Sequence, residues 1–318
     1  MTKPLTILDI ARLAGVGKST VSRVLNNDAR VKDSTRAKVQ AVIDQHDFLP
    51  SKSARAMRAQ RSGVVGVIVA KLSSNSENTA LTGLLNTLYA RGYDAAIMET
   101  QFSQQKAQAH LDVLKRRNVD GIIFFGFSGC DLSALAPFAP HCVVLAIDSN
   151  DYASVSYDNQ GAVTQVMAHF YAQGLRHIHF LGIDEHDETT GRARTHAYHS
   201  FCDRHQLPAR LHRCEMSLHA AYKATDSLID SQTQAVVCAS DTLALGVAKR
   251  LQTLGREDIA IGGIGNHDML RFMFPRAVSV ELGYHQAGQH AAELLLKQLD
   301  ETPTEITHWT QPCHLVVP

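Results

Sequence analysis

The sequence predicts a small all-α head with a helix-turn-helix, followed by an α/β body of two doubly wound parallel-sheet lobes. Three observations support this fold class. Two short helical stretches flank a glycine near the N-terminus, basic residues are concentrated in the first 62 positions, and apolar runs typical of buried parallel strands recur from Gly63 onward. With 318 residues, the chain is long enough for more than one domain.

The first predicted helix begins after Thr6, a residue type suited to the N-cap. Asp9 stands three residues later, where the acid of a capping box belongs. Gly15 ends this helix, and a second short helix is expected over 18–25, ending at 26–27. Two short helices joined by a tight turn with a glycine form the helix-turn-helix pattern.

The second helix has two chemically different faces. Val21, Val24 and Leu25 are expected to point inward. The outward set is polar or basic, as contacts with base edges and phosphates require, and consists of Lys18, Ser19, Ser22 and Arg23.

The charge distribution supports a DNA-binding head. Residues 1–62 carry 12 Lys and Arg against 5 Asp, a net charge of +7, whereas the remaining chain carries 19 basic and 26 acidic residues, a net charge of −7. A basic head can neutralise phosphates and release counterions. The acidic body is repelled by DNA.

The segment 15–20 contains the Gly-Lys-Ser of a phosphate-binding P-loop, but the first glycine of that motif would fall at Arg12, and a helix rather than a strand precedes it. No paired carboxylates, nucleophile–base motif or metal signature stands out. We therefore expect no enzyme, no metal and no cofactor. A sugar-phosphate enzyme with an added head and a purely architectural DNA-binding protein remain the alternatives from other classes.

No apolar run approaches the roughly 20 residues of a membrane span, and the N-terminus lacks an apolar signal-peptide core. The six cysteines are scattered without a Cys-x-x-Cys pair, so free thiols are expected. These features predict a cytoplasmic, nucleoid-associated protein with no membrane partner.

Apolar runs in the body alternate with helical stretches. A first series comprises 64–69, 95–98, 121–125 and 143–147, and a second comprises 177–182, 235–240 and 259–265. Such alternation predicts two parallel sheets that bind ligands beyond the carboxyl ends of their strands.

Polar, glycine and aromatic residues follow the predicted strand ends. Each alone has a structural explanation, glycine in turns and Asp or Thr in caps, but their shared placement predicts a polar ligand. Lys71, Arg194 and the amides of 126–129 suit a charged group, and the other polar side chains suit sugar hydroxyls, so a sugar phosphate fits both sets. The predicted effector-binding residues are Lys71, Gly126, Phe127, Ser128, Gly129, Asp148, Asp187, Thr189, Thr190, Arg194, Thr242, Asn266 and Tyr284.

The stretch LTILDIARLAGVGKSTVSRVLNN at 5–27 resembles the head of LacI-type bacterial repressors, and the resemblance continues through 36–39 and 48–51 and then over the whole chain. It implies a homodimer that binds double-stranded operator DNA, and lobes of the periplasmic-binding-protein type. The implied domains are a head at 1–49, a hinge at 50–62 and an effector-binding and dimerisation body at 63–318. Its lobe 1 would hold about 63–158 plus 285–318, and lobe 2 about 159–284.

Taken alone, the sequence of residues 50–62 is typical of a solvated linker. Its start with Pro and Ser also allows a helix to begin there. The resemblance implies a hinge helix that folds on operator DNA, with Met57 as an apolar wedge in the minor groove and Ala54 permitting close approach. The predicted DNA-binding residues are Thr6, Gly17, Lys18, Ser19, Thr20, Ser22, Arg23, Asn26, Ser53, Ala54 and Met57.

Within the family, the stretches 76–78, 99–103, 114–121, 125–129 and 189–191 resemble those of repressors of trehalose operons. That resemblance implies trehalose 6-phosphate as the effector, with Arg194 as its anchor. Lys71 stands where the resemblance leads us to expect Arg. Lysine keeps the positive charge but lacks the bidentate fork of arginine. A different sugar or sugar phosphate therefore remains the alternative.

Overall fold

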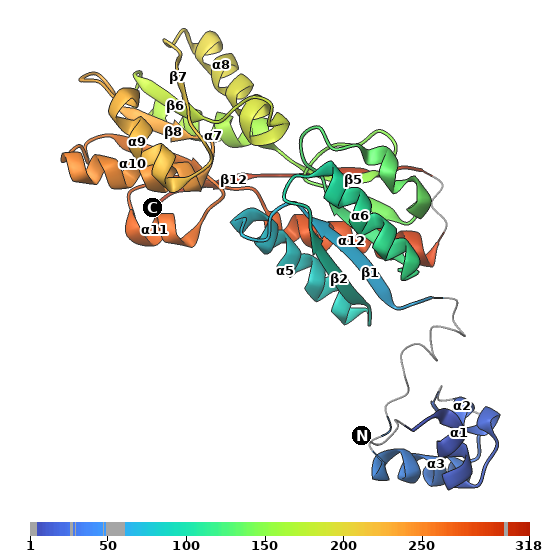
Figure 1. Ribbon diagram of the computed structural model, residues 1–318. Helices are drawn as coiled ribbons and strands as arrows, with labels where there is room; N and C mark the ends of the chain where they lie inside the picture. Colours follow the sequence, from blue (N-terminus) through green and yellow to red (C-terminus); the bar gives the residue numbers. More distant parts are fainter. Residues whose placement is uncertain (1–4, 26–27, 29, 47, 49–60, 302–304) are drawn as a thin grey trace. The chain divides into compact units, whose positions relative to one another are not determined.

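The computed structural model describes residues 5–25, 28, 30–46, 48, 61–301 and 305–318. It divides into two compact units, Met1–Gly63 and Val64–Pro318, which we call the head and the body (Figure 1). Among the described residues, no helix is long and apolar enough to cross a membrane.

The head holds the three helices α1 (Ile7–Ala14), α2 (Lys18–Leu25) and α3 (Asp33–Gln45). The predicted capping box is confirmed, because the Thr6 hydroxyl accepts from the Asp9 amide while the Asp9 carboxylate accepts from the Thr6 amide. Gly15 ends α1 in the left-handed conformation at φ 64°, which glycine adopts without strain. The predicted bounds of the second helix, 18–25, match α2.

All three helices contribute to one small core in the head. Ile10, Val21 and Val39 are fully buried, one from each helix. This core fixes the angle between α1 and α2.

The first sheet of the body is wholly parallel, with the strand order β11-β5-β4-β3-β1-β2. Its strands are β1 (Val64–Val69), β2 (Asp94–Glu99), β3 (Gly121–Phe125), β4 (Cys142–Leu145), β5 (Ala153–Tyr157) and β11 (His308–Gln311). The accompanying helices are α5 (Asn75–Ala90), α6 (Gln104–Arg116), α12 (Tyr284–Asp300) and the 3₁₀ turn η1 (Leu132–Phe138).

The second sheet has the order β12-β10-β9-β8-β6-β7, and only β12 runs antiparallel to its neighbour. Its strands are β6 (Ile178–Gly182), β7 (Arg210–Arg213), β8 (Ala235–Cys238), β9 (Ala260–Ile264), β10 (Val278–Glu281) and β12 (His314–Val316). Its helical segments are α7 (Asn159–Ala172), α8 (Arg194–His205), α9 (Leu218–Leu228), α10 (Asp241–Leu254), α11 (Asp268–Met273) and the π-helical turn η2 (Glu188–Ala193). The two parallel-sheet lobes predicted from the sequence are thereby confirmed.

The chain passes between the two sheets three times, from β5 to α7, from β10 to α12 and from β11 to β12. The expectation that all of 285–318 returns to the first lobe is wrong for the last strand. Val316 pairs with Ser279 of β10, so β12 closes the edge of the second sheet. A strand of three residues is too short for its pattern to show which sheet it joins.

Close packing of α5 against α12 sets the position of the crossing from β10 to α12. A Cβ atom on Gly83 would overlap the carbonyl of His285, and one on Gly288 would overlap the carbonyl of Ala80. The two helix backbones therefore touch, which holds Tyr284, the first residue of α12, at the carboxyl edge of β10.

Candidate functional site

The exposed face of α2 carries three of the eight DNA-contacting residues predicted in the head. Lys18, Ser19 and Arg23 are exposed, as is Gly17 in the turn before them, and Thr20 is half-buried. The expectation that Ser22 points outward is wrong, because Ser22 is buried. On a helix that turns 100° per residue, Ser22 lies beside Leu25, so the packed face extends to it.

Two aspartates of the head pair with neighbouring arginines. The Asp28 carboxylate accepts from the amide, Nε and Nη2 of Arg30 at 2.8–3.0 Å, and these hydrogen bonds lower the pKa of Asp28. Arg12 Nη1 lies 3.6 Å from Asp9 Oδ1. Asn26, Ser53, Ala54 and Met57, and with them the predicted hinge helix, lie outside the described residues.

In the body, the predicted effector residues follow the carboxyl ends of strands in both sheets. Lys71 follows β1, residues 126–129 follow β3, Asp148 follows β4, Asp187 follows β6, Thr242 follows β8, Asn266 follows β9 and Tyr284 follows β10. Parallel strands bring these ends to one edge of each sheet.

Arg194 is 4% exposed and lies against residues at the ends of β5, β8 and β10. Its Nε donates to Asn159 Oδ1 at 2.9 Å, and its Nη1 donates to the carbonyl of Ala239. Burial raises the pKa of Tyr284 against the lowering effect of the nearby Arg194, and the Tyr284 ring meets that of Tyr157 edge-on at 5.0 Å. A buried guanidinium held from several sides is a rigid donor for a ligand. We call these five residues the Arg194 cluster.

Sequence reasoning missed Asn159. Its signal was the Asp158-Asn159 pair directly after β5, where the Asp158 carboxylate caps α7 by accepting from the Gly161 amide at 2.7 Å. This cap turns Asn159, the first residue of α7, toward Arg194.

A buried carboxylate also missed by sequence reasoning supports Asn266. Asp241 accepts from the His267 amide at 2.6 Å, and the Ser279 hydroxyl lies 2.7 Å from its Oδ1. Ser279 in turn accepts from the Asn266 amide at 2.9 Å. Burial raises the pKa of Asp241 to about 6 against the lowering effect of these donors and of Arg194.

Asp187 caps the helical turn η2. Its Oδ1 accepts from the amides of Thr189, Thr190 and Gly191 at 2.7–3.2 Å, and from the Thr189 hydroxyl at 3.1 Å. The capped turn η2 leads straight into Arg194. Asp187 therefore positions Arg194, and all four of these hydrogen bonds use its Oδ1.

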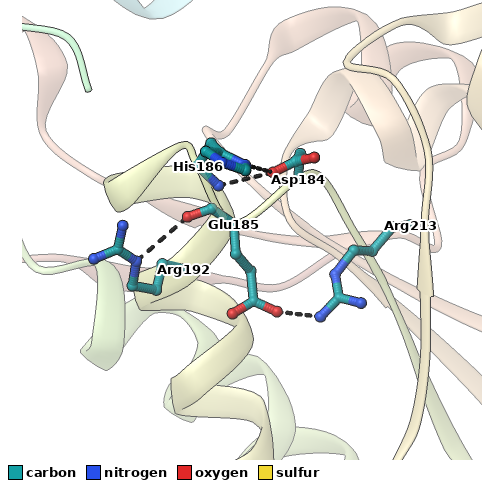
Figure 2. Close-up of a pocket in the computed structure, with 5 residues that line it drawn as sticks. All are labelled: Asp184, Glu185, His186, Arg192 and Arg213. Atoms are coloured by element: carbon teal, nitrogen blue, oxygen red, sulfur yellow. Dashed lines mark hydrogen bonds and ion pairs between the residues drawn. The ribbon is translucent and has the colours of Figure 1, made fainter. Parts of the chain in front are cut away.

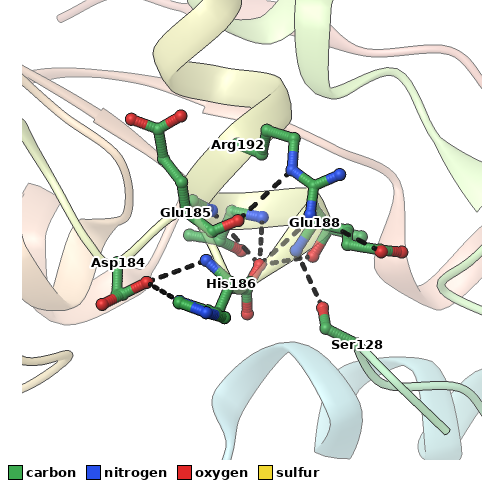
Figure 3. Close-up of polar contacts among 10 residues, drawn as sticks. Ser128, Asp184, Glu185, His186, Glu188 and Arg192 are labelled. Atoms are coloured by element: carbon green, nitrogen blue, oxygen red, sulfur yellow. Dashed lines mark hydrogen bonds and ion pairs between the residues drawn. The ribbon is translucent and has the colours of Figure 1, made fainter.

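The loop that carries Asp187 also contacts the first sheet. The Glu188 amide donates to Ser128 Oγ at 2.8 Å, which links the end of β6 to the end of β3 (Figure 3). Arg192 Nε donates to the Glu185 carbonyl at 3.3 Å, and Arg213 pairs with the Glu185 carboxylate (Figure 2). Ser128 thus contacts the opposite lobe.

The segment 126–129 differs from the anion-binding turn that we expected. The Gly126 amide donates to the Leu145 carbonyl at 2.8 Å, so it is taken by β3–β4 pairing and is not open to a ligand. The turn does not begin a helix directly, because η1 starts later and is capped by Asp131. Phe127 is 8% exposed and packs against Phe124, which leaves little of its ring for a sugar. Gly129 has φ +75° and open space around it.

Lys71 is exposed at the end of β1, in a turn held by two carboxylates. Its amide and that of Ala70 donate to Glu77 Oε2 at 3.0 and 2.8 Å, and the Leu72 amide donates to Glu99 Oε1 at 2.7 Å. Burial raises the pKa of Glu77. Asp148 is exposed, and Thr242 is half-buried in the first turn of α10. No group of three His, Cys, Asp or Glu side chains in the described part of the chain could hold a metal ion.

A helix-turn-helix head joined to a two-sheet body with a polar cluster at the strand ends defines the class of ligand-responsive transcription regulators. The chain belongs to the lacI family of bacterial regulatory proteins. It matches "Bacterial regulatory proteins, lacI family" over residues 6–51 and "Periplasmic binding protein-like domain" over 167–317.

Two curated relatives resemble the chain over nearly its whole length. It is 46% identical over 300 residues to the HTH-type transcriptional regulator TreR of Salmonella typhimurium, which covers 94% of this chain and 95% of that one. It is 44% identical over 318 residues to TreR of Escherichia coli strain K12, covering 100% and 99%.

Solved structures agree with these relatives. The trehalose repressor from Escherichia coli superposes with a TM-score of 0.77 at 39% identity, covering 80% of this chain and 99% of that one. The lac repressor dimer bound to operator and the anti-inducer ONPF superposes with a TM-score of 0.87 at 20% identity over 99% and 98%, a likeness of fold.

Proposed function

We propose that this protein represses a trehalose uptake and catabolism operon as a homodimer, and that trehalose 6-phosphate releases it from its operator. The observation that carries the proposal is the Arg194 cluster, a buried guanidinium among polar strand-end residues. The names of the relatives support trehalose as the controlled sugar. The protein acts on the nucleoid in the cytoplasm and catalyses no reaction.

On DNA, α2 enters the major groove with Lys18, Ser19 and Arg23 facing bases and phosphates. Two heads of a dimer read two half-sites, and Ser53, Ala54 and Met57 contact the minor groove between them. Arg23→Ala weakens operator binding by about 1–3 kcal/mol if Arg23 pairs with a guanine. The exposed Arg204 of the body supplies the matched control, since Arg204→Ala leaves operator affinity unchanged.

In the body, Arg194 anchors the sugar, and Asp148, Thr190, Thr242, Asn266 and Tyr284 surround it. Lys71 attracts the phosphate from the first lobe as a point charge. In the turn 126–129 after β3, Ser128 and Gly129 contribute polar groups to the site. The Gly126 amide does not, because it donates to the Leu145 carbonyl.

Fluorescence anisotropy with labelled operator DNA tests this function. Adding trehalose 6-phosphate releases the operator at concentrations where trehalose and glucose 6-phosphate do not. If another sugar phosphate releases it instead, the trehalose assignment is wrong while the repressor remains. If no ligand alters operator affinity, the protein is an unregulated DNA-binding protein.

Calorimetry on Lys71→Ala tests the phosphate contact. Loss of a charge-assisted contact lowers affinity for the phosphorylated sugar by roughly 10- to 100-fold and affects free trehalose much less. Lys71→Arg preserves phosphate binding because it keeps the charge. Equal weakening of both ligands by Lys71→Ala would mean that Lys71 does not recognise phosphate.

A further inference from the structure

The carboxylate at the end of β10 joins the proposed effector site to a crossing between the two sheets. Glu281, the last residue of β10, is half-buried, and its Oε2 accepts from Asn266 Nδ2 at 3.1 Å. Its Oε1 accepts from the amide of Gly283, the N-cap of α12, at 2.7 Å. We call these three residues the Glu281 bridge. We propose that Glu281 is a positioning residue that couples effector binding at Asn266 to the crossing from β10 to α12. The inference rests on the proposed function and adds a coupling residue to it.

Both ends of the Glu281 bridge need an acceptor, which suits a carboxylate. The Asn266 and Gly283 groups are both N–H donors, and each reaches a different oxygen of Glu281. A carboxamide has one oxygen and an NH2 group, and the NH2 group would face the other donor. Hydrogen bonds to a charged acceptor are also stronger than those between neutral groups. Glutamine at this position would therefore keep the shape of the side chain and break one end of the bridge.

Glu281 fixes which way the Asn266 side chain points. The side-chain nitrogen of Asn266 faces Glu281, and its Oδ1 lies 3.4 Å from Arg271 Nη1. The Asn266 backbone is held as well, since its amide donates to Ser279 Oγ at 2.9 Å. The side-chain nitrogen carries a second hydrogen, which a sugar oxygen can accept. A ligand that binds this nitrogen therefore acts directly on the hydrogen bond to Glu281.

The crossing that Glu281 holds is packed too closely to move by itself. Gly283 has φ 69°, and a Cβ atom there would lie 2.6 Å from Nε2 of Gln311, the last residue of β11. The Gln311 carbonyl accepts from the amide of Asp158, in the crossing from β5 to α7, at 3.2 Å. Close-packed groups pass a displacement to their neighbours. A change at Gly283 therefore reaches all three crossings between the sheets.

A purely local role for Glu281 is the alternative. A carboxylate that only capped the turn at Gly283 would stabilise the body without linking the two binding sites. The contact with Asn266 argues against that role, because Asn266 lies in a different turn, after β9 and 15 positions earlier in the sequence. Coupling and stability are separate quantities, so measuring both distinguishes the two roles.

Calorimetry with trehalose 6-phosphate, in the presence and absence of saturating operator DNA, tests the coupling in the full-length protein. The ratio of the two affinities is the coupling factor. The key variant is Glu281→Gln, and the matched control is Glu293→Gln, at an exposed position of α12. We expect Glu281→Gln to lower the coupling factor about five-fold, because one hydrogen bond of the bridge is lost. The control should keep the wild-type factor.

A second variant shows whether Glu281 acts through Asn266. In Asn266→Ala the bridge is already broken, so adding Glu281→Gln should leave the coupling factor of that variant unchanged within about two-fold. If the effects of the two substitutions instead multiply, Glu281 acts independently of Asn266 and the inference is wrong.

The remaining outcomes separate this inference from the proposed function. If Glu281→Gln has the wild-type coupling factor, the carboxylate is only a structural cap and the inference fails, although trehalose 6-phosphate still releases the operator. If wild type itself neither binds trehalose 6-phosphate nor leaves the operator, the proposed function fails, and the inference fails with it. Equal melting temperatures of wild type and Glu281→Gln exclude a folding defect as the cause of a lower coupling factor.

Discussion

At the scale of single residues, the site depends on side chains that hold other side chains. Asn159 holds Arg194 through a 2.9 Å hydrogen bond, and Ser279 joins Asp241 to the Asn266 backbone. Neither Asn159 nor Asp241 is among the predicted effector-binding residues. Both nevertheless hold residues of the proposed site in place, because a buried polar group without its partner is costly.

Replacing Asn159 tests this dependence. We expect Asn159→Ala to lower effector affinity roughly 10- to 100-fold while operator affinity stays within about two-fold, because Arg194 loses a charge-assisted partner and no residue of the head is changed. Calorimetry and anisotropy measure the two affinities. Gln252→Ala, at an exposed position of α10, is the carboxamide control and changes neither affinity. An unchanged effector affinity in Asn159→Ala would show that Ala239 and Tyr284 suffice to hold the guanidinium.

Asp241 gives the body a pH-dependent stability. Folding raises the pKa of this carboxyl from 3.8 to about 6, chiefly through burial. The folded state therefore holds a proton that the unfolded state releases between about pH 4 and pH 6. The contribution of Asp241 is fully present below pH 4 and is lost as the pH rises through 6, a change on the order of 3 kcal/mol.

Urea unfolding of wild type and Asp241→Asn across pH 4 to 8 measures this contribution. As the pH rises from 4 to 6, wild type should lose unfolding free energy relative to Asp241→Asn. Above pH 7 the difference between the two proteins should be constant. A difference that is constant over the whole range would contradict the raised pKa.

At the scale of elements, local sequence sets α1 most directly. Its capping box, its apolar spacing and its left-handed Gly15 all agree with one helix. By contrast, β5, β7, β10, β11 and β12 escaped prediction, because strands of three to five residues at a sheet edge or crossing carry too little pattern.

The cap of α1 makes a prediction at this scale. Thr6→Ala should destabilise α1 by about 1 kcal/mol, because it removes the side-chain partner of the Asp9 amide. Hydrogen exchange of residues 7–14 in the full chain should then become about five-fold faster. Thr6→Ser keeps the hydroxyl and should exchange like wild type. Equal exchange in Thr6→Ala would mean that packing alone holds the helix.

At the scale of the whole molecule, the proposed repressor needs the body to influence the head. The Glu188–Ser128 hydrogen bond joins the two strand-end regions, so effector binding at these ends is linked to how the lobes meet. Any such influence must be reciprocal, since the coupling free energy is shared by both ligands.

Titrating trehalose 6-phosphate with and without saturating operator DNA measures this reciprocity. Operator should weaken effector binding by the same factor by which effector weakens operator binding, a factor of about 5–150 for typical coupling energies. A random duplex of equal length serves as the control and should leave effector affinity unchanged. Identical effector affinities in the presence and absence of operator would exclude allosteric release.

Local pattern determined the head, the alternation of the body and the kinds of residue at the strand ends, because helix caps, apolar periods and strand ends depend on neighbours in sequence. Three features were decided by tertiary structure alone. The Gly126 amide donates to the Leu145 carbonyl, Phe127 packs inside the first lobe, and β12 joins the second sheet. Tertiary structure also brought Asn159 to Arg194, 35 positions apart in sequence. Hydrogen-bond partners across sheets and lobes are set by how the chain crosses between them, which no local window of sequence contains.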